Sequence, residues 1–449
     1  MAKRRSSPRR QATKGRPPEA ERRPDLGFRV DLIPLYLLVL VTPWVVDPEA
    51  LDSFRLPKLI VAETLALPSL GALALRLRTV EALSWKSLAG IPAVRALFPV
   101  LIAAALGFLT SDHLGHVGRA YPSLLIAVAA VIGWSIALRH RERRQLFLLM
   151  LAPAFVLSAL GILQYFGIAT PFDFGDISRR LAVTSRAGGA YDLAAYLLLP
   201  VLVTQVGWKL AKKPWQRYVF AGLLAVFVFA IVVTQTLTAI FALVLMSVIF
   251  WLPLLARRDW LRTMAAGITV LIVMVLAFAP LRDRLATKIT NVERGQVNDF
   301  FTGRLDGWRA AWWMFTEHPI VGVGHGAYRA EYGRARLVLY ADGVEFYQKQ
   351  HQTFFVNAHS DPLEALAEWG LVGAIAMLWG VWWIGRSLRR RYGELRQRDP
   401  AVAAFLPAAL AALVVLACTG FPLHLALIAY PFLLVLSEVL APADEEVEA

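Results

Sequence analysis

The sequence predicts an all-α fold: a polytopic membrane bundle of about twelve transmembrane helices, with a large extracytoplasmic loop that contains short helices. Hydrophobic residues fill 57% of its 449 positions, whereas soluble domains average roughly 45–50%. The excess lies in runs of roughly 17–25 residues, the length that crosses a hydrocarbon core. Short basic segments separate these runs in alternation, as in multi-pass membrane proteins.

The predicted spans follow the apolar runs, and one run is long enough to hold two of them. Residues 218–256 form a continuous apolar stretch. At about 1.5 Å per residue it is too long for one span, so we divide it at Thr234–Thr236. The twelve spans then lie at about 30–46, 57–76, 92–110, 119–138, 144–166, 189–207, 217–233, 236–255, 262–281, 363–386, 402–417 and 420–440.

These spans divide the chain into five segments. They are a basic tail (1–27) that we expect to be disordered, the first part of the bundle with about nine spans (28–281), a long loop (282–362), the last part of the bundle with about three spans (363–441) and an acidic tail (442–449). Loops as long as 282–362 are usually functional or disordered. Trp308, Trp312 and Trp313 argue against disorder and predict short helices at the membrane interface.

The charge distribution predicts the orientation of the spans. The formal net charge is +14, which in a soluble protein would suggest a nucleic-acid partner. Here the basic residues lie in the N-terminal tail and in five alternate loops. Loops rich in Lys and Arg are retained on the cytoplasmic side of the membrane, which explains this distribution of basic residues. We therefore expect membrane lipids as partners and no nucleic acid. Both termini are then cytoplasmic, and segments 167–188 and 282–362 are extracytoplasmic.

Several chemistries have no motif in this sequence. The single cysteine, Cys418, lies in an apolar run, which argues against a disulfide framework and a cysteine-based metal site. The sequence contains no CxxC, Walker loop or GxGxxG pattern, and its histidines show no metal-like grouping on one element. We therefore expect neither a metal nor a nucleotide cofactor.

Two patterns in and after the long loop resemble a known family. The first joins Gly303–Arg309 to Phe315–Gly324, and the second places His359, Ser360, Gly370 and Gly373 in an H-S-x9-G-x-x-G spacing. Together they resemble the O-antigen ligase and O-antigen polymerase superfamily. Weaker similarities lie upstream at Phe54–Lys58, Gly161–Gly167 and Asp192–Leu197, so the resemblance runs in order from about residue 54 to 424.

The resemblance implies an activity and a location. Members of the superfamily transfer a glycan from undecaprenyl diphosphate to an acceptor at the outer face of the bacterial cytoplasmic membrane, without nucleotide or metal. The acceptor is a lipid A core in ligases and a second lipid-linked glycan in polymerases. A ligase of lipopolysaccharide biosynthesis is the preferred expectation because the loop lies late in the chain and the histidine motif has the matching spacing. A polymerase and a protein O-oligosaccharyltransferase remain alternatives.

The resemblance also implies site residues. His359 is the expected catalytic histidine, and a histidine is a suitable base for an acceptor hydroxyl. Arg304 is expected to bind the diphosphate, because guanidinium groups bind phosphate oxygens bidentately. Further expected diphosphate-binding residues are Arg186, Arg180 and Arg309, and expected supporting residues are Glu368 and Ser360. Many family members carry an arginine in the turn that corresponds to Thr234–Thr238, and this sequence has none there.

Two other classes of protein were weighed against an enzyme. A transporter or flippase of lipid-linked glycans would also use many spans and extracytoplasmic arginines, but it predicts charged residues near the middle of several spans. A structural membrane protein leaves the Arg, Trp and His content of the long loop without a role. The predicted spans hold few charges and the candidate groups gather at one face, which favours the enzyme.

Overall fold

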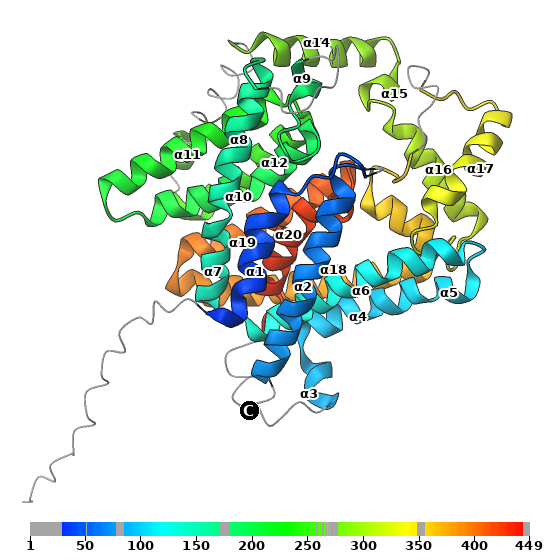
Figure 1. Cartoon of the computed structure of the whole chain (residues 1–449). Coiled ribbons are helices and arrows are strands. Elements are labelled where there is room, and N and C mark those ends of the chain that lie inside the picture. The colour runs from blue at the N-terminus through cyan, green and yellow to red at the C-terminus, as the bar shows by residue number, and fades with distance from the viewer. Residues whose placement is uncertain are drawn as a thin grey trace, which may run out of the picture.

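The computed structural model describes residues 29–50, 52–77, 85–169, 179–256, 259–262, 277–347 and 355–442, together with 265, 267 and 269. Every regular element within these ranges is helical, and the protein is a polytopic membrane protein (Figure 1). The elements up to residue 165 are η1 Val30–Leu32, α1 Ile33–Val41, η2 Thr42–Trp44, α2 Arg55–Leu77, α3 Trp85–Gly90, α4 Pro92–Ala105, α5 Gly107–Thr110, α6 Leu114–Ala137, α7 His140–Leu149 and α8 Leu151–Tyr165.

The remaining helices complete the bundle and the segment that covers one end of it. The middle of the chain holds α9 Arg179–Ala182, α10 Ala190–Leu210, α11 Pro214–Val233, α12 Leu237–Trp251 and η3 Leu252–Leu254. The long loop holds α14 Ala279–Glu293, α15 Val297–Phe300, α16 Arg304–Glu317 and α17 Tyr328–Ala341. The last part of the bundle consists of α18 Asp361–Arg398, α19 Pro400–Thr419, η5 Pro422–His424 and α20 Ala426–Val439.

Eight helices in the described part of the chain are long and apolar enough to cross a membrane. Three more predicted spans coincide with α2 and with the shorter apolar helices Val30–Trp44 and Ala426–Val439. The span predicted at 262–281 falls largely outside the described residues, as does the basic tail, so the count of twelve stays a prediction. The division of the run 218–256 is confirmed, because α11 ends at Val233 and α12 begins at Leu237.

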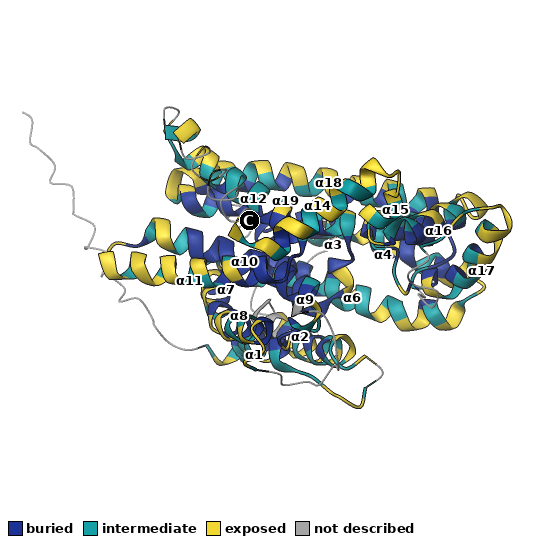
Figure 2. Cartoon of the chain, turned by 90° about the horizontal axis from the view of Figure 1, so that it is seen from above, coloured by how far each residue is buried: buried dark blue, intermediate teal, exposed yellow. Residues whose placement is uncertain are grey.

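The centre of the bundle is α10, which packs against α8, α11, α12, α19 and α20. Nearly all its residues from Ala190 to Gln205 are buried, whereas α11 and α6 carry exposed faces (Figure 2). A helix that is apolar all round belongs in the interior of such a bundle. Outer helices expose apolar side chains, for example Ile375, Leu378 and Val381 on α18, as expected for surfaces in contact with lipid.

The long loop has a small apolar core of its own. Ala310 and Met314 of α16, Tyr328 and Tyr332 of α17, and Phe355 pack together there. This core attaches to the bundle through α16, which packs along α18. Figure 1 shows α14 along the top of the bundle and α15 to its right, with α16 and α17 farther to the right and lower, above α5 and α6. The loop therefore covers the end of the bundle at which α2, α10, α18 and α20 begin.

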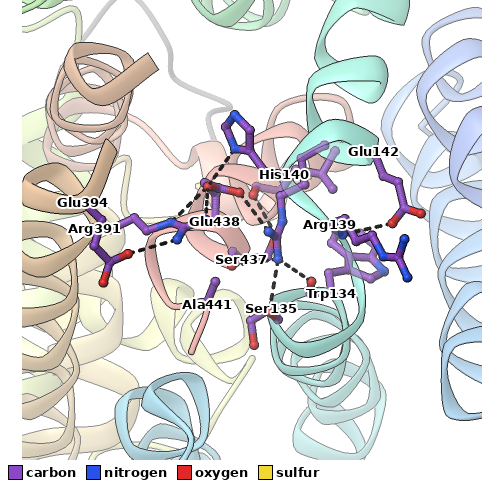
Figure 3. Close-up of polar contacts among 12 residues, drawn as sticks. Trp134, Ser135, Arg139, His140, Glu142, Arg391, Glu394, Ser437, Glu438 and Ala441 are labelled. Carbon is purple, nitrogen blue, oxygen red and sulfur yellow. Dashed lines mark hydrogen bonds and ion pairs between the residues drawn. The ribbon is translucent and has the colours of Figure 1, made fainter. Parts of the chain in front are cut away.

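At the opposite end, buried ion pairs join four helices. The Glu438 carboxylate of α20 accepts hydrogen bonds from Arg143 of α7 at 2.8 Å and from Arg391 of α18 at 2.9 Å. His140 lies 3.2 Å from the same carboxylate (Figure 3). Arg143 also donates to the carbonyls of Trp134 and Ser135 at the end of α6, at 2.7 and 3.1 Å. One carboxylate thus fixes where α6, α7, α18 and α20 meet.

Replacing Glu438 tests this junction. Glu438→Ala removes the paired carboxylate of the buried Arg143 and leaves Arg391 with Glu394 alone, and breaking a buried pair costs about 3–5 kcal/mol. We expect a clearly lower melting temperature for this variant in nanodiscs. The matched control is Glu394→Ala, because Glu394 also pairs with Arg391 but its side chain is 35% exposed. Equal melting temperatures for the two variants would contradict the role given to Glu438.

Candidate functional site

Helix α18 is interrupted at Gly370, where the loop segment 319–324 is inserted. Gly370 has φ 58° and ψ −153°, a conformation open essentially only to glycine. In an unbroken helix, the carbonyls of residues 367 and 368 would accept from the N–H groups of residues 371 and 372. Here these helix groups bond to the loop instead. The loop N–H groups of Val323 and Gly324 donate to the carbonyls of Ala367 (3.0 Å) and Glu368 (2.9 Å). The helix N–H groups of Leu371 and Val372 donate to the carbonyls of Pro319 (2.9 Å) and Ile320 (3.1 Å).

The glycines of the two motifs permit this close approach. A Cβ on Gly322 would lie 2.3 Å from the Glu368 backbone, and one on Gly370 would lie 2.5 Å from the Ile320 backbone. The motif spacing that suggested the family therefore has a structural reason. It fixes how the loop docks onto the helix that follows His359.

The segment Gly303–Trp308 brings Arg304 to His359. Gly303 has φ 80° and starts α16, so that Arg304 is the first residue of the helix. Gly307 follows on the next turn, and a Cβ there would lie 2.9 Å from the carbonyl oxygen of Ala358. Trp308 Nε1 donates to the His359 carbonyl at 3.3 Å. Helix α16 thus rests directly on the segment that carries His359.

The His359 ring is held in one orientation. Its Nδ1 lies 3.2 Å from the carbonyl oxygen of Asn357. A carbonyl can only accept, so Nδ1 carries the proton and the neutral ring keeps its lone pair on Nε2. Phe355 and Phe421 pack edge-on against the ring, with centroids at 5.1 and 4.9 Å. The backbone of His359 has φ 58°, which is unusual outside glycine and marks strain of the kind found at functional sites.

A buried glutamate anchors this segment. Glu364, on the first turn of α18, accepts from the Ala358 N–H at 2.7 Å and from the Asn357 side-chain amide at 2.9 Å. Asn357 in turn accepts from His359. The carboxylate therefore holds the residues on which the orientation of the histidine ring depends.

Two arginines from distant parts of the chain lie next to His359. The charges of Arg304 and Arg55 both act on the ring. Arg55 is the first residue of α2; its Nε lies 3.4 Å from Asp192 Oδ2, and its guanidinium lies 5.1 Å from the centre of the Phe421 ring. Arg304 makes no side-chain hydrogen bond or ion pair with any residue that the structure describes. An arginine without a counter-charge beside a histidine is an arrangement suited to an anionic ligand.

Among the residues that the structure describes, positive charges outnumber negative charges around this position. Five cations lie in or around it, whereas the carboxylates are Asp52 and Asp192, whose charges reach Lys58, and Asp361, whose charge reaches Tyr191. The cations are Arg55, Lys58, Arg186, Arg284 and Arg304. The Nε atom of Arg284 is buried and has no hydrogen-bond partner in the described part of the chain. Lys58 donates to the carbonyls of Val45 and Phe54 at 2.7 and 3.4 Å.

These surroundings favour the neutral form of His359. Burial and the charge of Arg304 lower the pKa of His359 to about 4, while the hydrogen bond to Asn357 opposes the shift. Burial also lowers the pKa of the Arg304 guanidinium, which remains charged because free arginine titrates far above neutral pH. Near neutral pH the site holds an unprotonated imidazole beside a cation.

The structure brings some of the expected site residues together and places others apart. It brings Arg304 close enough to His359 for the charge of Arg304 to act on the imidazole ring. Arg186 is exposed, donates to the Trp44 carbonyl at 3.4 Å, and its charge acts on Lys58. Arg180 lies in α9, but its side chain is outside the described residues. Arg309 donates to the Glu345 carbonyl at 3.0 Å, because a residue five positions after Arg304 faces a different side of a helix with about 3.6 residues per turn.

The two expected supporting residues have structural partners. Glu368 accepts from the Tyr328 N–H at 3.2 Å and lies 3.1 Å from His325 Nδ1. It therefore holds the start of α17 and does not face His359. Ser360 is buried at the start of α18, where its carbonyl accepts from the Glu364 N–H at 2.9 Å.

Four residues at the site had no predicted role: Arg55, Tyr191, Asp192 and Phe421. Tyr191 lies beside Phe421, with ring centroids 6.4 Å apart, and the charge of Arg304 acts on its phenol group. The sequence held a clue to three of them. Arg55 and Asp192 lie in the segments Phe54–Lys58 and Asp192–Leu197, which resemble the family more weakly, and Tyr191 directly precedes Asp192. No sequence feature marked Phe421.

A glycine substitution tests the docking of the loop. In Gly370→Ala the added Cβ meets the Ile320 backbone in a conformation that alanine does not adopt, which costs of order 1–3 kcal/mol. We expect a lower melting temperature. The control is Gly385→Ala on the same helix, where the added Cβ meets nothing within 4 Å and we expect no destabilisation. If Gly370→Ala and Gly385→Ala have the same melting temperature, the docking of the loop does not depend on the interruption of α18 at Gly370.

A comparison with protein-family models finds a match for the segment that carries part of the site. Residues 221–378 match the family described as O-antigen ligase. The match includes Arg304, His359 and Gly370, whereas Arg55, Asp192 and Phe421 lie outside it. A search of the curated proteins finds no match. The resemblance inferred from the sequence is thereby confirmed for residues 221–378, which match as an O-antigen ligase domain.

Proposed function

We propose that this protein is a glycosyltransferase that moves a glycan from undecaprenyl diphosphate to an acceptor sugar, the lipid A core, at the outer face of the bacterial cytoplasmic membrane. The observation that carries the proposal is the position of His359, whose Nδ1 donates to Asn357 and so leaves Nε2 as an acceptor, near Arg304, which has no side-chain partner among the described residues. Both residues lie in the segment that matches the O-antigen ligase family.

In the proposed reaction, His359 acts as the general base. The acceptor hydroxyl oxygen attacks the anomeric carbon of the donor sugar, and its proton passes to His359 Nε2. The new glycosidic bond forms as the bond between the anomeric carbon and the phosphate oxygen breaks. Asn357 stabilises the protonated ring by accepting from Nδ1. A positioned base of this kind typically contributes 10²–10⁴-fold to the rate.

The arginines stabilise the leaving group. Undecaprenyl diphosphate gains negative charge as the bond to the sugar breaks, and it lies at the membrane surface. Fixed guanidinium groups aimed at a developing charge lower the barrier without reorganisation. Arg304 is free for this task, and Arg55 is oriented for it by Asp192 and Phe421. The concentration of these groups at one end of the helices supports a transferase over a transporter, which needs charged groups along a path.

Substitutions at the site test the mechanism. His359→Ala and Arg304→Ala should abolish glycan transfer, a loss of at least about 10²-fold, while membrane insertion stays intact. Arg309→Ala is the matched control, since its guanidinium faces Glu345, and it should retain most of the transfer. Normal transfer by both His359→Ala and Arg304→Ala would remove the mechanistic proposal.

The pH dependence of transfer gives a second test. His359 works as a base only while Nε2 is unprotonated, so activity should be lost as the pH falls through about 4. An unperturbed histidine would lose activity near pH 6.5. Initial rates over an acid pH series, with thermal unfolding followed in parallel, separate the two. An acid limb near 6.5 in folded protein would contradict the proposed environment of His359.

A deletion strain distinguishes a ligase from a polymerase of the same superfamily. If the protein is the ligase, long glycan chains accumulate on the lipid carrier and none reach the lipid A core. If it is a polymerase, single-repeat glycans cap the core instead. Analysis of the carrier-bound and core-bound glycans gives the answer directly, and wild-type glycans in both fractions would contradict either assignment.

A further inference from the structure

His424 lies between two buried carboxylates at the start of α18. It belongs to the short connection between α19 and α20, which also carries Phe421. Its Nδ1 lies 3.2 Å from Asp361 Oδ1 and its Nε2 lies 3.3 Å from Glu364 Oε1. The side chains of Asp361 and Glu364 are 9% and 4% exposed, and that of His424 is 40% exposed. Both nitrogens of one ring therefore face acidic groups.

This geometry assigns a charge to His424. Burial raises the pKa of Glu364 to about 7, and the charge of His424 opposes this shift. Ionised carboxylates only accept hydrogen bonds, so with both carboxylates ionised each ring nitrogen carries a proton and the ring is an imidazolium. Burial lowers the pKa of His424, but the charges of Glu364 and Asp361 outweigh it and raise the pKa above its ordinary value, and Glu368 on the next turn acts in the same direction. In return, the cation relieves the repulsion between two carboxylates one helical turn apart.

The contacts of Glu364 link His424 to His359. The same carboxylate that faces His424 accepts from the Ala358 N–H and the Asn357 amide. Asn357 then orients the His359 ring through Nδ1. On the other side, Asp361 accepts from the Leu423 N–H at 3.3 Å, which fixes the connection that carries Phe421. Phe421 packs on His359 and against the Arg55 guanidinium.

We propose that His424 is a positioning residue: as an imidazolium bridging Asp361 and Glu364, it locks the segment that carries His359 to the connection that carries Phe421. The proposal rests on the proposed function of His359 as the base. His424 itself touches neither donor nor acceptor. Its loss should therefore disturb the orientation of the base and leave the binding of the donor by Arg55 and Arg304 largely intact.

Three variants separate charge, hydrogen bonding and simple packing. His424→Gln keeps a donor but removes the charge, and His424→Arg keeps both a charge and two donors. The control is His318→Gln, because His318 is exposed and its side chain makes no hydrogen bond, ion pair or ring contact in the described part of the chain. Each variant is compared with the wild-type full chain in nanodiscs that contain the membrane lipids of the host.

The first readout is stability, which needs no assumption about function. The wild-type protein should melt above His424→Gln near neutral pH, where the imidazolium is present. This difference should vanish as the pH rises through the raised pKa of His424, because the wild-type ring then loses its charge. The arginine variant should show no such loss. A difference between wild type and His424→Gln that is independent of pH would overturn the assigned charge.

The second readout is the kinetics of transfer from undecaprenyl-diphosphate-linked glycan. His424→Gln should lower kcat by about tenfold or more while KM for the donor changes by less than about twofold, and His424→Arg should recover most of kcat. A pH-dependent stability difference with unchanged kcat would overturn the positioning role and leave the proposed function standing. Full transfer by His359→Ala would instead show that the proposed function itself fails.

Discussion

The insertion of segment 319–324 into the interruption of α18 is the constraint on which the rest of the site depends. Four backbone groups of α18 that would form two hydrogen bonds within an unbroken helix form four hydrogen bonds to the loop instead. Each of these backbone groups keeps a hydrogen-bond partner, so the interruption of the helix avoids the free-energy cost of burying unpaired N–H and C=O groups. It also fixes the long loop against the first turns of α18. Glu364 and Glu368 then reach, respectively, the segment before α18 and the start of α17.

The arginines at the two ends of the bundle differ in how they are paired with carboxylates. At one end of the bundle, Arg143 and Arg391 pair with the same carboxylate, that of Glu438. At the other end, and among the residues that the structure describes, Arg304 has no counter-charge, the Nε atom of Arg284 has no hydrogen-bond partner, and Arg55 pairs with Asp192. Burying a cation without a partner is costly, so such a site is stabilised when an anion enters it. Burial, together with the charge of Arg304, keeps His359 neutral, which is the state that accepts a proton.

The parts of this account that sequence could predict are those set by local patterns. Apolar runs predicted the helices, and the polar Thr234–Thr236 predicted the division between α11 and α12. The motif spacing, read through its family resemblance, pointed to Arg304 and His359. Contacts between distant segments were not predictable in this way. Arg55 and Asp192 are 137 residues apart, and no periodicity reports that α2 and α10 begin side by side. Closeness in sequence was also a poor guide to contact. Arg309 lies five residues after Arg304 but donates to the Glu345 carbonyl, and Glu368 lies nine residues after His359 but accepts from the Tyr328 N–H.

The most direct test of the central claim is the binding of undecaprenyl diphosphate to the purified protein in nanodiscs. If Arg304 is held without a partner in order to bind the diphosphate, Arg304→Gln should weaken binding by about tenfold or more, the loss expected for a charge-assisted hydrogen bond. Arg309→Gln should bind within about twofold of the wild type, since its guanidinium is engaged elsewhere. Equal affinity of Arg304→Gln and the wild type would contradict the assignment of this end of the bundle as the donor site.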